Sequence, residues 1–555
     1  MAKASMDSCN QPIRCDVLTL CLFRSFHFRV NESISSGWFP WQLHPLIMAF
    51  YRTCTKEVSA HLLYEHLHLC VSPGNVRRDR SYAYSTYGTF KKMGIPGPKP
   101  VLLYGNMLAY RQGLIDFDQD NFRKYGKTWG IFDGRQPVLC IADPTMIKAV
   151  LVKECYSFFT NRRNFRLNGP MYDAVNLVKD DRWRRIRSIL TPSFTSGRLK
   201  EMFGIMKHHS DNLVSSMKKT ADKDEPLDFK ELFGSYSMDT VASTCFSVDI
   251  DSLNNPSDPF FSNIKKMFKF DLLSPLFLII AFFPFFGPIF EKLEFAFVAS
   301  EVTDFFYTAL QKIKSNREES AKKFRVDPLQ LMIDSQKNTD PSNKKKGLSD
   351  HEILSQAMFF LFASHVATSS SLTFLAYNLA TNPEVMKKMQ EEIDRTFPNK
   401  APVDYQTLMQ MEYLDCAINE SLRLYPVVVR LERVAKASVE INGLVIPKDM
   451  VVMIPTWTLH RDPNIWPEPE KFKPERFSKE NKDTIDPYTH MPFGLGPRNC
   501  LGMRFSLLTI KLAMVEILQK FSFAMCKETE VPLALDLQGF LAPKRPVKLK
   551  LVPRS

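Results

Sequence analysis

Residues 349–382 carry the pattern that most limits how this chain can fold. Ser349 and Glu352 match the Ser-x-x-Glu capping box of a helix N-terminus, and Pro383 suits the first turn of a following helix. At 1.5 Å per residue, the predicted helix is roughly 50 Å long. Its centre, residues 358–363, is apolar on every side, so other elements must surround it. The pattern predicts a large, mainly helical protein with this helix in its core.

Short strand-like runs interrupt the helical spacing in the rest of the chain. Apolar residues recur three and four positions apart, whereas residues 138–141 and 451–454 are runs typical of strands. We therefore expect a mainly α fold with a minor β region. Polar, basic segments at residues 315–323 and 338–347 are predicted to be loops.

The chain divides into two regions. Residues 1–85 show no clear periodicity and are predicted to be an irregular extension. The prolines of residues 94–100 fix φ and remove hydrogen-bond donors, which gives a stiff lead-in. Residues 86–555 are predicted to form a single domain, because one set of motifs runs through them.

Composition and charge exclude some classes of function. Lys and Arg number 73 against 60 Asp and Glu, a net charge of +13 that suits an anionic membrane surface or an acidic protein partner. Without a nucleic-acid motif, no nucleic-acid partner is expected. The 11 cysteines include no C-x-x-C pair, which argues against a disulfide framework and a zinc ribbon. One cluster lacks zinc-finger spacing and is interpreted as polar surface: His61, His66, His68 and Cys70.

Membrane attachment is not evident from the start of the chain. Residues 33–51 are uncharged, but prolines and polar residues interrupt them, so no N-terminal membrane-spanning helix is expected. Residues 272–290 are strongly apolar, and Pro275, Pro284 and Pro288 rule out one straight spanning helix there. A surface that dips into a bilayer and a buried core segment are equally compatible with this stretch.

The strongest chemical signal lies at residues 493–502. They read Phe-Gly-Leu-Gly-Pro-Arg-Asn-Cys-Leu-Gly and fit the haem-thiolate pattern F-x-x-G-x-R-x-C-x-G at every fixed position. Gly496 and Gly502 would let the loop approach a porphyrin closely. An amphipathic run at about residues 503–521 would place Cys500 at a helix N-terminus, where the dipole favours the thiolate. The alternative is a buried structural cysteine beside a glycine-rich turn.

Further motifs precede this loop in a fixed order. Trp183 and Arg187 form W-x-x-x-R, Glu420 and Arg423 form E-x-x-R, and Arg476 lies within Pro-Glu-Arg-Phe. Taken singly, each also fits an ordinary basic helix or a surface ion pair. Four longer stretches make the resemblance to one protein family more specific. They are residues 158–163, 430–434, 459–463 and 486–502.

Together these segments, over about residues 87–553, resemble the cytochrome P450 superfamily and, within it, vertebrate family 3, subfamily A. The resemblance implies the mainly α haem-thiolate fold, haem b as cofactor and Cys500 as the iron ligand. It implies a microsomal, unspecific monooxygenase on the cytosolic face of the endoplasmic reticulum membrane. Such an enzyme oxidises lipophilic steroids and xenobiotics with O2 and electrons from NADPH-cytochrome P450 reductase, and its thiolate promotes cleavage of dioxygen.

The resemblance also implies roles for individual residues. The haem contacts are Arg162, Trp183, Arg187, Arg433, Phe493, Arg498 and Cys500. The residues that pin the segment presenting the cysteine are Glu420, Arg423 and Arg476. The substrate pocket is lined by Phe165, Asn176, Phe362, Ala363, Val427, Val428 and Arg430. For the apolar members of that pocket, ordinary core packing is the alternative.

The chain departs from this family on its long helix. Where the family has Ala-Gly-x-Glu-Thr-Thr, Ser364 replaces the glycine, Val366 the acid and Ala367 the alcohol. That acid and alcohol ordinarily hold water and relay protons. Thr368 lies about 100° around the helix from Ala367 and cannot simply substitute, whereas Ser364 shares roughly the same face and could hold a water. Ser364 and Thr368 are therefore the remaining catalytic candidates.

Three functions remain compatible with this departure. Since proton-relay groups contribute about a hundred- to ten-thousand-fold, we expect haem binding and electron transfer to persist while oxygenation is slow or uncoupled. A haem-thiolate isomerase or dehydratase of lipid peroxides would need no relay. A non-catalytic haem or steroid binder is the third possibility.

The chain also departs from the family before the proline-rich lead-in. The family has a membrane-anchor helix there, whereas this chain has residues 1–85. Either a different splice or gene model supplied this start, or membrane attachment relies on residues 272–290 and a basic surface.

Overall fold

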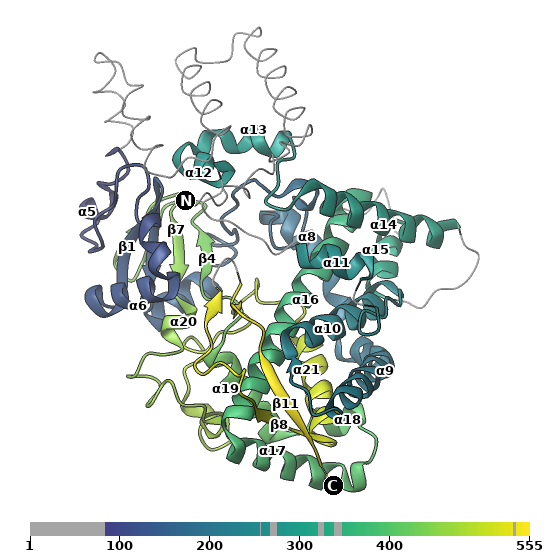
Figure 1. Ribbon diagram of the computed structural model, residues 1–555. Helices are drawn as coiled ribbons and strands as arrows, with labels where there is room; N and C mark the ends of the chain where they lie inside the picture. Colours follow the sequence, from purple (N-terminus) through teal and green to yellow (C-terminus); the bar gives the residue numbers. More distant parts are fainter. Residues whose placement is uncertain are drawn as a thin grey trace, which may run out of the picture. The chain divides into compact units, whose positions relative to one another are not determined.

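The computed structural model describes residues 84–255, 257–266, 275–319, 327–337, 347–536 and 540–554 (Figure 1). Helices dominate this part of the chain, as predicted. They are α5 (Thr89–Lys92), α6 (Leu114–Tyr125), α7 (Pro144–Lys148), α8 (Asp180–Leu190), α9 (Ser196–Ala221), α10 (Phe229–Phe246), α11 (Pro259–Lys266), α12 (Pro275–Phe282), α13 (Gly287–Lys292), α14 (Ser300–Glu319), α15 (Pro328–Lys337), α16 (Asp350–Thr381), α17 (Pro383–Thr396), α18 (Tyr405–Leu408), α19 (Glu412–Leu424), α20 (Thr456–Leu459) and α21 (Met503–Leu518). Residues 1–83 lie outside the described residues, so the extension, the His61 to Cys70 cluster, the expected absence of an N-terminal spanning helix and the domain division stay predictions.

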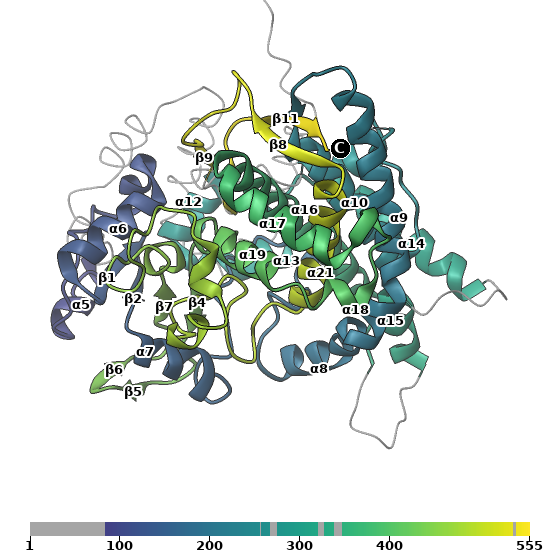
Figure 2. The same cartoon turned by 90° about the horizontal axis from the view of Figure 1, so that it is seen from below.

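The strands form small sheets beside the helices (Figure 2). They are β1 (Thr128–Asp133), β2 (Gln136–Ile141), β3 (Leu227–Asp228), β4 (Leu431–Val434), β5 (Val439–Ile441), β6 (Leu444–Ile446), β7 (Val451–Ile454), β8 (Phe521–Met525), β9 (Leu535–Asp536), β10 (Ala542–Pro543) and β11 (Lys548–Pro553). The four-stranded sheet has the order β1-β2-β7-β4, in which β2 and β7 run parallel with Val138 opposite Val451. The two strand-like runs predicted from sequence are therefore confirmed as strands, and the structure shows that they are neighbours in one sheet.

Helix α16 confirms the long buried helix. Ser349 Oγ accepts the amide of Glu352 at 3.2 Å, and the Glu352 carboxylate accepts the amide of Ser349 at 3.0 Å, so the predicted capping box is formed. Helices α10 and α21 pack along α16 (Figure 1). Among the described residues α16 is the one helix long and apolar enough to cross a membrane, yet 78% of that stretch is buried inside the protein. Its apolar surface is therefore explained by its place in the core.

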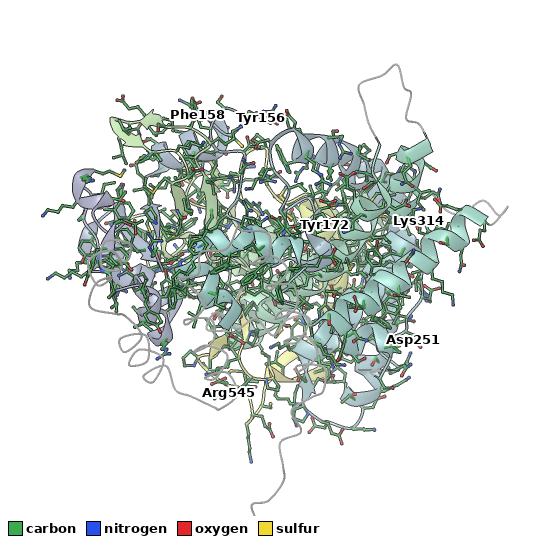
Figure 3. All side chains as sticks on the ribbon, turned by 90° about the horizontal axis from the view of Figure 1, so that it is seen from above. Tyr156, Phe158, Tyr172, Asp251, Lys314 and Arg545 are labelled. Carbon is green, nitrogen blue, oxygen red and sulfur yellow. The ribbon has the colours of Figure 1, made fainter. Side chains whose placement is uncertain are left out.

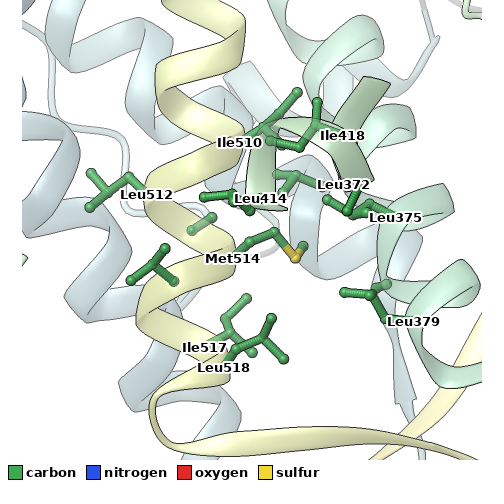
Figure 4. Close-up of a cluster of buried hydrophobic side chains, with 14 of the residues drawn as sticks. Leu372, Leu375, Leu379, Leu414, Ile418, Ile510, Leu512, Met514, Ile517 and Leu518 are labelled. Carbon is green, nitrogen blue, oxygen red and sulfur yellow. The ribbon is translucent and has the colours of Figure 1, made fainter. Parts of the chain in front are cut away.

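Packing around α16 joins helices that lie far apart in the sequence. Leu375 and Leu379 of α16 face Leu414 of α19 and Met514 of α21 in the close-up (Figure 4). The view with all described side chains drawn as sticks shows side chains filling the space between the ribbons (Figure 3). Lys314 of α14, labelled there, pairs with Asp350 at 3.0 Å and so ties α14 to the first turn of α16.

Two sequence predictions about local structure need correction. Residues 315–319 belong to α14 rather than to a loop, because Arg317 is buried and pairs with Asp327 at 2.6 Å. Helix α21 ends at Leu518 and is buried on nearly all sides, so it is not amphipathic. Residues 320–323 and 338–346, predicted as loops, lie outside the described residues.

The apolar stretch at residues 272–290 combines both readings left open by the sequence. The described part is divided into α12, a 3-10 turn at Pro284–Phe286 and α13, so its prolines prevent one straight helix, as predicted. Phe277 and Phe290 are buried, whereas Phe285 is 49% and Ile289 44% exposed. Part of this stretch is therefore core and part is an apolar surface.

Candidate active site

The Cys500 loop is a tight backbone structure that comes directly before α21. The amide of Cys500 donates to the carbonyl of Phe493 at 2.8 Å. Gly496 has φ +73°, and a Cβ there would lie 2.0 Å from the carbonyl oxygen of Leu151. From the sequence, glycine at position 496 was expected to let a porphyrin approach the loop. The structure shows that the close approach of the Leu151 backbone already requires glycine at this position. A Cβ on Gly502, by contrast, meets no described atom within 4 Å.

Cys500 carries a thiol that keeps an accessible surface although protein surrounds it on most sides. Burial raises its pKa, while the backbone amide of Gly502 and the charges of Arg187 and Arg162 act in the opposite direction. The position before α21 also favours the anion, because the first amides of a helix point toward it. The loop therefore offers one accessible sulfur in an electropositive setting, which suits binding of a soft metal ion.

Arg162 and Arg187 act on this sulfur through their charges, and Arg162 in turn lies near Arg433 and Arg498. Arg162 donates to the carbonyl of Arg498 at 3.0 Å, and Arg187 donates to the carbonyl and side chain of Asn499 at 2.8 and 2.9 Å. Arg498 donates to the carbonyl of Val178 at 2.5 Å. Asn499 was missed by the sequence reasoning because the family pattern leaves its position open. Arg162, Arg187 and Arg498 are thereby tied to the Cys500 loop or to its neighbours, whereas Arg433 donates to the carbonyl of Glu432 at 2.9 Å.

These arginines lack anionic partners within the described part of the chain. None of the four forms an ion pair there, and Arg433 Nε and Arg498 Nη1 are buried without a hydrogen-bond partner. Burial and the charge of Arg162 lower the pKa of Arg433 to about 9 and that of Arg498 to about 8. Uncompensated buried charges are unfavourable, so the cluster fits a ligand with carboxylates. Haem carries two carboxylates and an iron atom, and these residues fit it.

Helix α8 brings both residues of the W-x-x-x-R motif to the cluster. Trp183 is buried, and the guanidinium carbon of Arg498 lies 4.7 Å from the centroid of its ring. The structure therefore places Trp183 against Arg498 as a cation–π partner. Arg187 follows one turn later and bonds Asn499.

The departing residues of α16 offer little for proton transfer. Ser364, Val366 and Ala367 are half-buried. Thr368 is buried, and its hydroxyl lies 3.3 Å from that of Ser506 on α21, so it is already engaged. Burial lowers the pKa of His365 to about 4, which leaves this imidazole neutral at physiological pH. Ser364 is therefore the remaining half-buried hydroxyl among the predicted catalytic residues.

The structure brings Glu420, Arg423 and Arg476 together. Arg423 donates twice to the Glu420 carboxylate, at 2.7 and 2.8 Å, and both side chains are fully buried. Arg476 donates to the same carboxylate at 3.3 Å. His460 extends the group: its Nδ1 donates to the carbonyl of Arg423 at 3.2 Å, and its Nε2 accepts the amide of Met491 at 3.0 Å. This buried network reaches the start of the Cys500 loop.

The predicted pocket residues are placed in several environments. Phe165 packs edge-on against Phe277 at 5.0 Å between ring centroids, and Phe362 packs against Phe540 at 5.8 Å. Ala363 and Val428 are half-buried, whereas Val427 is buried and accepts the amide of Leu541 at 2.9 Å. Among the residues that the structure describes, the buried side-chain oxygen of Asn176 has no hydrogen-bond partner.

Arg430 belongs to a buried charge cluster that the sequence did not reveal. It donates to both oxygens of Asp118, at 2.6 and 2.7 Å. Nearby, Arg163 pairs with Asp133 at 2.5 Å and also with Glu432. Burial works against ionisation, yet Arg163 and Arg430 lower the pKa of Asp133. Arg430 is thus held by α6 rather than being free for a substrate.

Comparisons with known proteins agree with this geometry. Residues 95–551 match the family model described as cytochrome P450. The chain is 74% identical over 474 residues to cytochrome P450 3A40 of Oryzias latipes, covering 85% of this chain and 94% of that protein. It is 74% identical to cytochrome P450 3A30 of Fundulus heteroclitus, covering 85% of this chain and 95% of that protein. It is 54% identical over 476 residues to cytochrome P450 3A29 of Sus scrofa, covering 85% and 94%. The predicted fold class and resemblance are confirmed, the family implies haem iron with a cysteine thiolate ligand, and the chain belongs to the cytochrome P450 family.

Proposed function

We propose that this chain is a haem-thiolate monooxygenase that hydroxylates or dealkylates lipophilic steroids and xenobiotics. In the overall reaction, one atom of O2 enters the substrate and the other leaves as water, with two electrons from NADPH and two protons. The supporting observation is the accessible Cys500 thiol beside four arginines that lack carboxylate partners in the described chain. Haem iron held by a thiolate supplies dioxygen activation and oxygen transfer.

The residues around Cys500 would hold the cofactor. Arg162, Arg187, Arg433 and Arg498 would bind its two carboxylates, and Trp183 would keep Arg498 in place through the 4.7 Å contact. Phe493 would fix the loop backbone through its carbonyl. The network of Glu420, Arg423 and Arg476 would hold the Cys500 loop in position through His460, which accepts the amide of Met491.

Ligation by Cys500 is tested by the reduced carbon-monoxide difference spectrum of the purified protein. We expect the spectrum of a thiolate-ligated haem, and we expect Cys500→Ala to abolish it. A colourless protein after haem supplementation, or an unchanged spectrum in Cys500→Ala, would overturn the proposal. Cys526, which is half-buried and outside the loop, provides a matched control as Cys526→Ala.

Proton delivery is the step in which this chain should be weak. Val366 and Ala367 carry no exchangeable proton, Thr368 is engaged with Ser506, and Ser364 alone would hold a water near the substrate. We expect much of the NADPH consumed to yield hydrogen peroxide instead of product. Restoring the pair with Val366→Glu and Ala367→Thr should raise the rate of product formation by about a hundred-fold or more, and should shift NADPH consumption from peroxide to product.

The coupling measurement requires reconstitution with NADPH-cytochrome P450 reductase and a lipophilic substrate. NADPH consumed, product formed and hydrogen peroxide released are compared on one sample. A matched control is Thr368→Val, which should leave the coupling ratio nearly unchanged because Thr368 faces Ser506. Tight coupling of the unaltered chain at normal turnover would refute the proposed weakness.

The protein is proposed to work on the cytosolic face of the endoplasmic reticulum membrane. The exposed side chains of Phe285 and Ile289 would enter the bilayer, and the net charge of +13 would favour an anionic surface. Binding to vesicles of phosphatidylcholine with phosphatidylserine should fall in the variant Phe285→Ser/Ile289→Ser. Unchanged binding would contradict this placement.

A second candidate function is isomerisation or dehydration of lipid hydroperoxides. The observation that favours it is the same pair, Val366 and Ala367, because a substrate with its own peroxide bond needs no proton relay on α16. Turnover of a fatty-acid hydroperoxide without NADPH would support this candidate. Normal substrate-induced spectral shifts with no product under any oxidant would instead indicate a binding protein.

A further inference from the structure

A cavity of about 710 Å³ lies away from the Cys500 site. It is bounded by α6, α20 and the segment around β9 and β10, and none of the residues proposed to bind haem lines it. Its volume falls in the range of small-molecule sites, roughly 300–1,000 Å³. Apolar walls come from Leu114, Ile115, Trp457, Leu533 and Leu535.

Arg461 is the innermost charge of this cavity. Its side chain is only 5% exposed, and its guanidinium carbon lies 3.4 Å from the centroid of the Trp457 ring. Nε donates to Glu470 at 3.2 Å, but the Glu470 side chain is 70% exposed, so solvent screens this contact. Burial lowers the pKa of Arg461 to about 10, which still leaves the group protonated at neutral pH.

Two buried donors on residues that line this cavity lack acceptors. Arg461 Nη1 and the indole Nε1 of Trp457 have no hydrogen-bond partner in the described chain. Buried polar groups in folded proteins are nearly always paired, so unpaired donors around a cavity indicate a missing acceptor. Because one of the two donors carries a charge, an anionic acceptor is favoured over a neutral one.

The remaining charges of the cavity lie at its exposed mouth. Arg111 and Lys544 balance Asp116 and Asp536 in number, and all four side chains are exposed. They therefore contribute little net field inside. The acids at the mouth and Glu470 disfavour a ligand with several negative charges.

We propose that this cavity binds a monoanionic amphiphile, with its carboxylate on Arg461 and its hydrocarbon body between Trp457, Ile115 and Leu535. A fatty acid and a fused-ring acid share this chemistry. The site is separate from the oxygenation chemistry, because it uses a different set of side chains and a different part of the fold. Its occupancy does not depend on whether the α16 residues support turnover.

Isothermal titration of the holoprotein with decanoate tests this site. A tight-binding azole is first placed on the haem iron, so that the substrate pocket is blocked. We expect one saturable site and a loss of affinity of about ten- to a hundred-fold in Arg461→Gln, the range for a charge-assisted hydrogen bond. Decanol, which has the same chain without the charge, should bind the unaltered protein as weakly as decanoate binds Arg461→Gln.

Two further variants keep the test decisive. Leu535→Trp should fill the cavity and abolish binding, and it decides the question alone if Arg461→Gln fails to fold. Arg123→Gln, an exposed arginine on α6 outside the cavity, should leave the affinity unchanged. A parallel titration with cholate distinguishes the two classes of ligand. If cholate binds more tightly than decanoate, the ligand is a fused-ring acid; if cholate binds more weakly, the ligand is a fatty acid.

The proposal is overturned if Arg461→Gln and Leu535→Trp both bind decanoate as the unaltered protein does. Decanol binding as tightly as decanoate would also overturn it, since the cavity would then be an apolar surface without anion recognition. Absence of saturable binding of both acids would have the same consequence. None of these results would bear on the carbon-monoxide spectrum, so this site and the proposed function fail separately.

Discussion

The buried pair of Glu420 and Arg423 allows a quantitative prediction about how the Cys500 loop is held. In Arg423→Met an unbranched apolar side chain replaces the guanidinium, so the charge and its hydrogen bonds are lost. Glu420, fully buried, would then keep only the amide of Lys473 at 2.9 Å and Arg476 at 3.3 Å as donors. Breaking a buried pair by removing one partner costs about 3–5 kcal/mol. The bond from Arg423 to the carbonyl of His460, 2.7 Å long, adds about 1 kcal/mol.

A loss of this size approaches the whole stability of a typical domain, about 5–15 kcal/mol. We therefore expect Arg423→Met to lose thiolate-ligated haem, seen in the carbon-monoxide spectrum, and to unfold at much lower urea concentration by circular dichroism. The double variant Glu420→Gln/Arg423→Met should recover part of the loss, because no charge remains buried without a partner. A matched control is Arg198→Met, which breaks an exposed pair with Glu201 at the same spacing and should cost at most about 1 kcal/mol. An Arg423→Met protein with unaltered spectrum and urea midpoint would refute this reasoning.

Three further predictions concern single positions. The pKa of His365 falls from 6.5 to about 4 on folding, so between these pH values the unfolded chain binds a proton that the folded chain does not. The free energy of unfolding should therefore fall by roughly 3 kcal/mol as the pH drops from 6.5 to 4. Urea unfolding should show this fall, and a smaller one in His365→Gln. His460→Phe leaves two buried partners unpaired, at a cost of about 2–4 kcal/mol, and should speed the transfer of haem to apomyoglobin; an unchanged rate would exclude a role in holding the loop. Gly496→Ala should prevent haem incorporation because of the 2.0 Å clash. Gly443 has φ +79°, and a Cβ there meets no described atom within 4 Å, so Gly443→Ala should cost only about 1–2 kcal/mol of backbone strain. Equal effects of the two substitutions on haem content would show that the clash is not the cause.

Local signals made much of this fold predictable. The capping box at Ser349 and the proline at 383 set the ends of α16 within one residue, because both act through neighbouring backbone groups. The Cys500 loop was found through a dense motif of fixed spacing. Thr368 was expected to point about 100° around the helix from Ala367. Its hydroxyl does turn aside, toward that of Ser506.

Long-range pairing made the rest unpredictable from one sequence. Arg430 and Asp118 lie 312 positions apart, and nothing in either segment marks the other as its partner. The cavity around Arg461 has the same origin, because its walls come from α6, α20 and β9. The buried character of α21 was missed for a related reason: whether a helix has a solvent face depends on what covers it.

The arginine cluster beside Cys500 links the final folding of this protein to the supply of its cofactor. Without carboxylates from a ligand, mutual repulsion and desolvation disfavour the compact state around Arg433 and Arg498. A ligand that binds only the folded chain stabilises it by mass action. Cells short of porphyrin should therefore hold newly made chains in a loosened form open to proteases, so that the abundance of this protein follows haem synthesis as well as transcription of its gene.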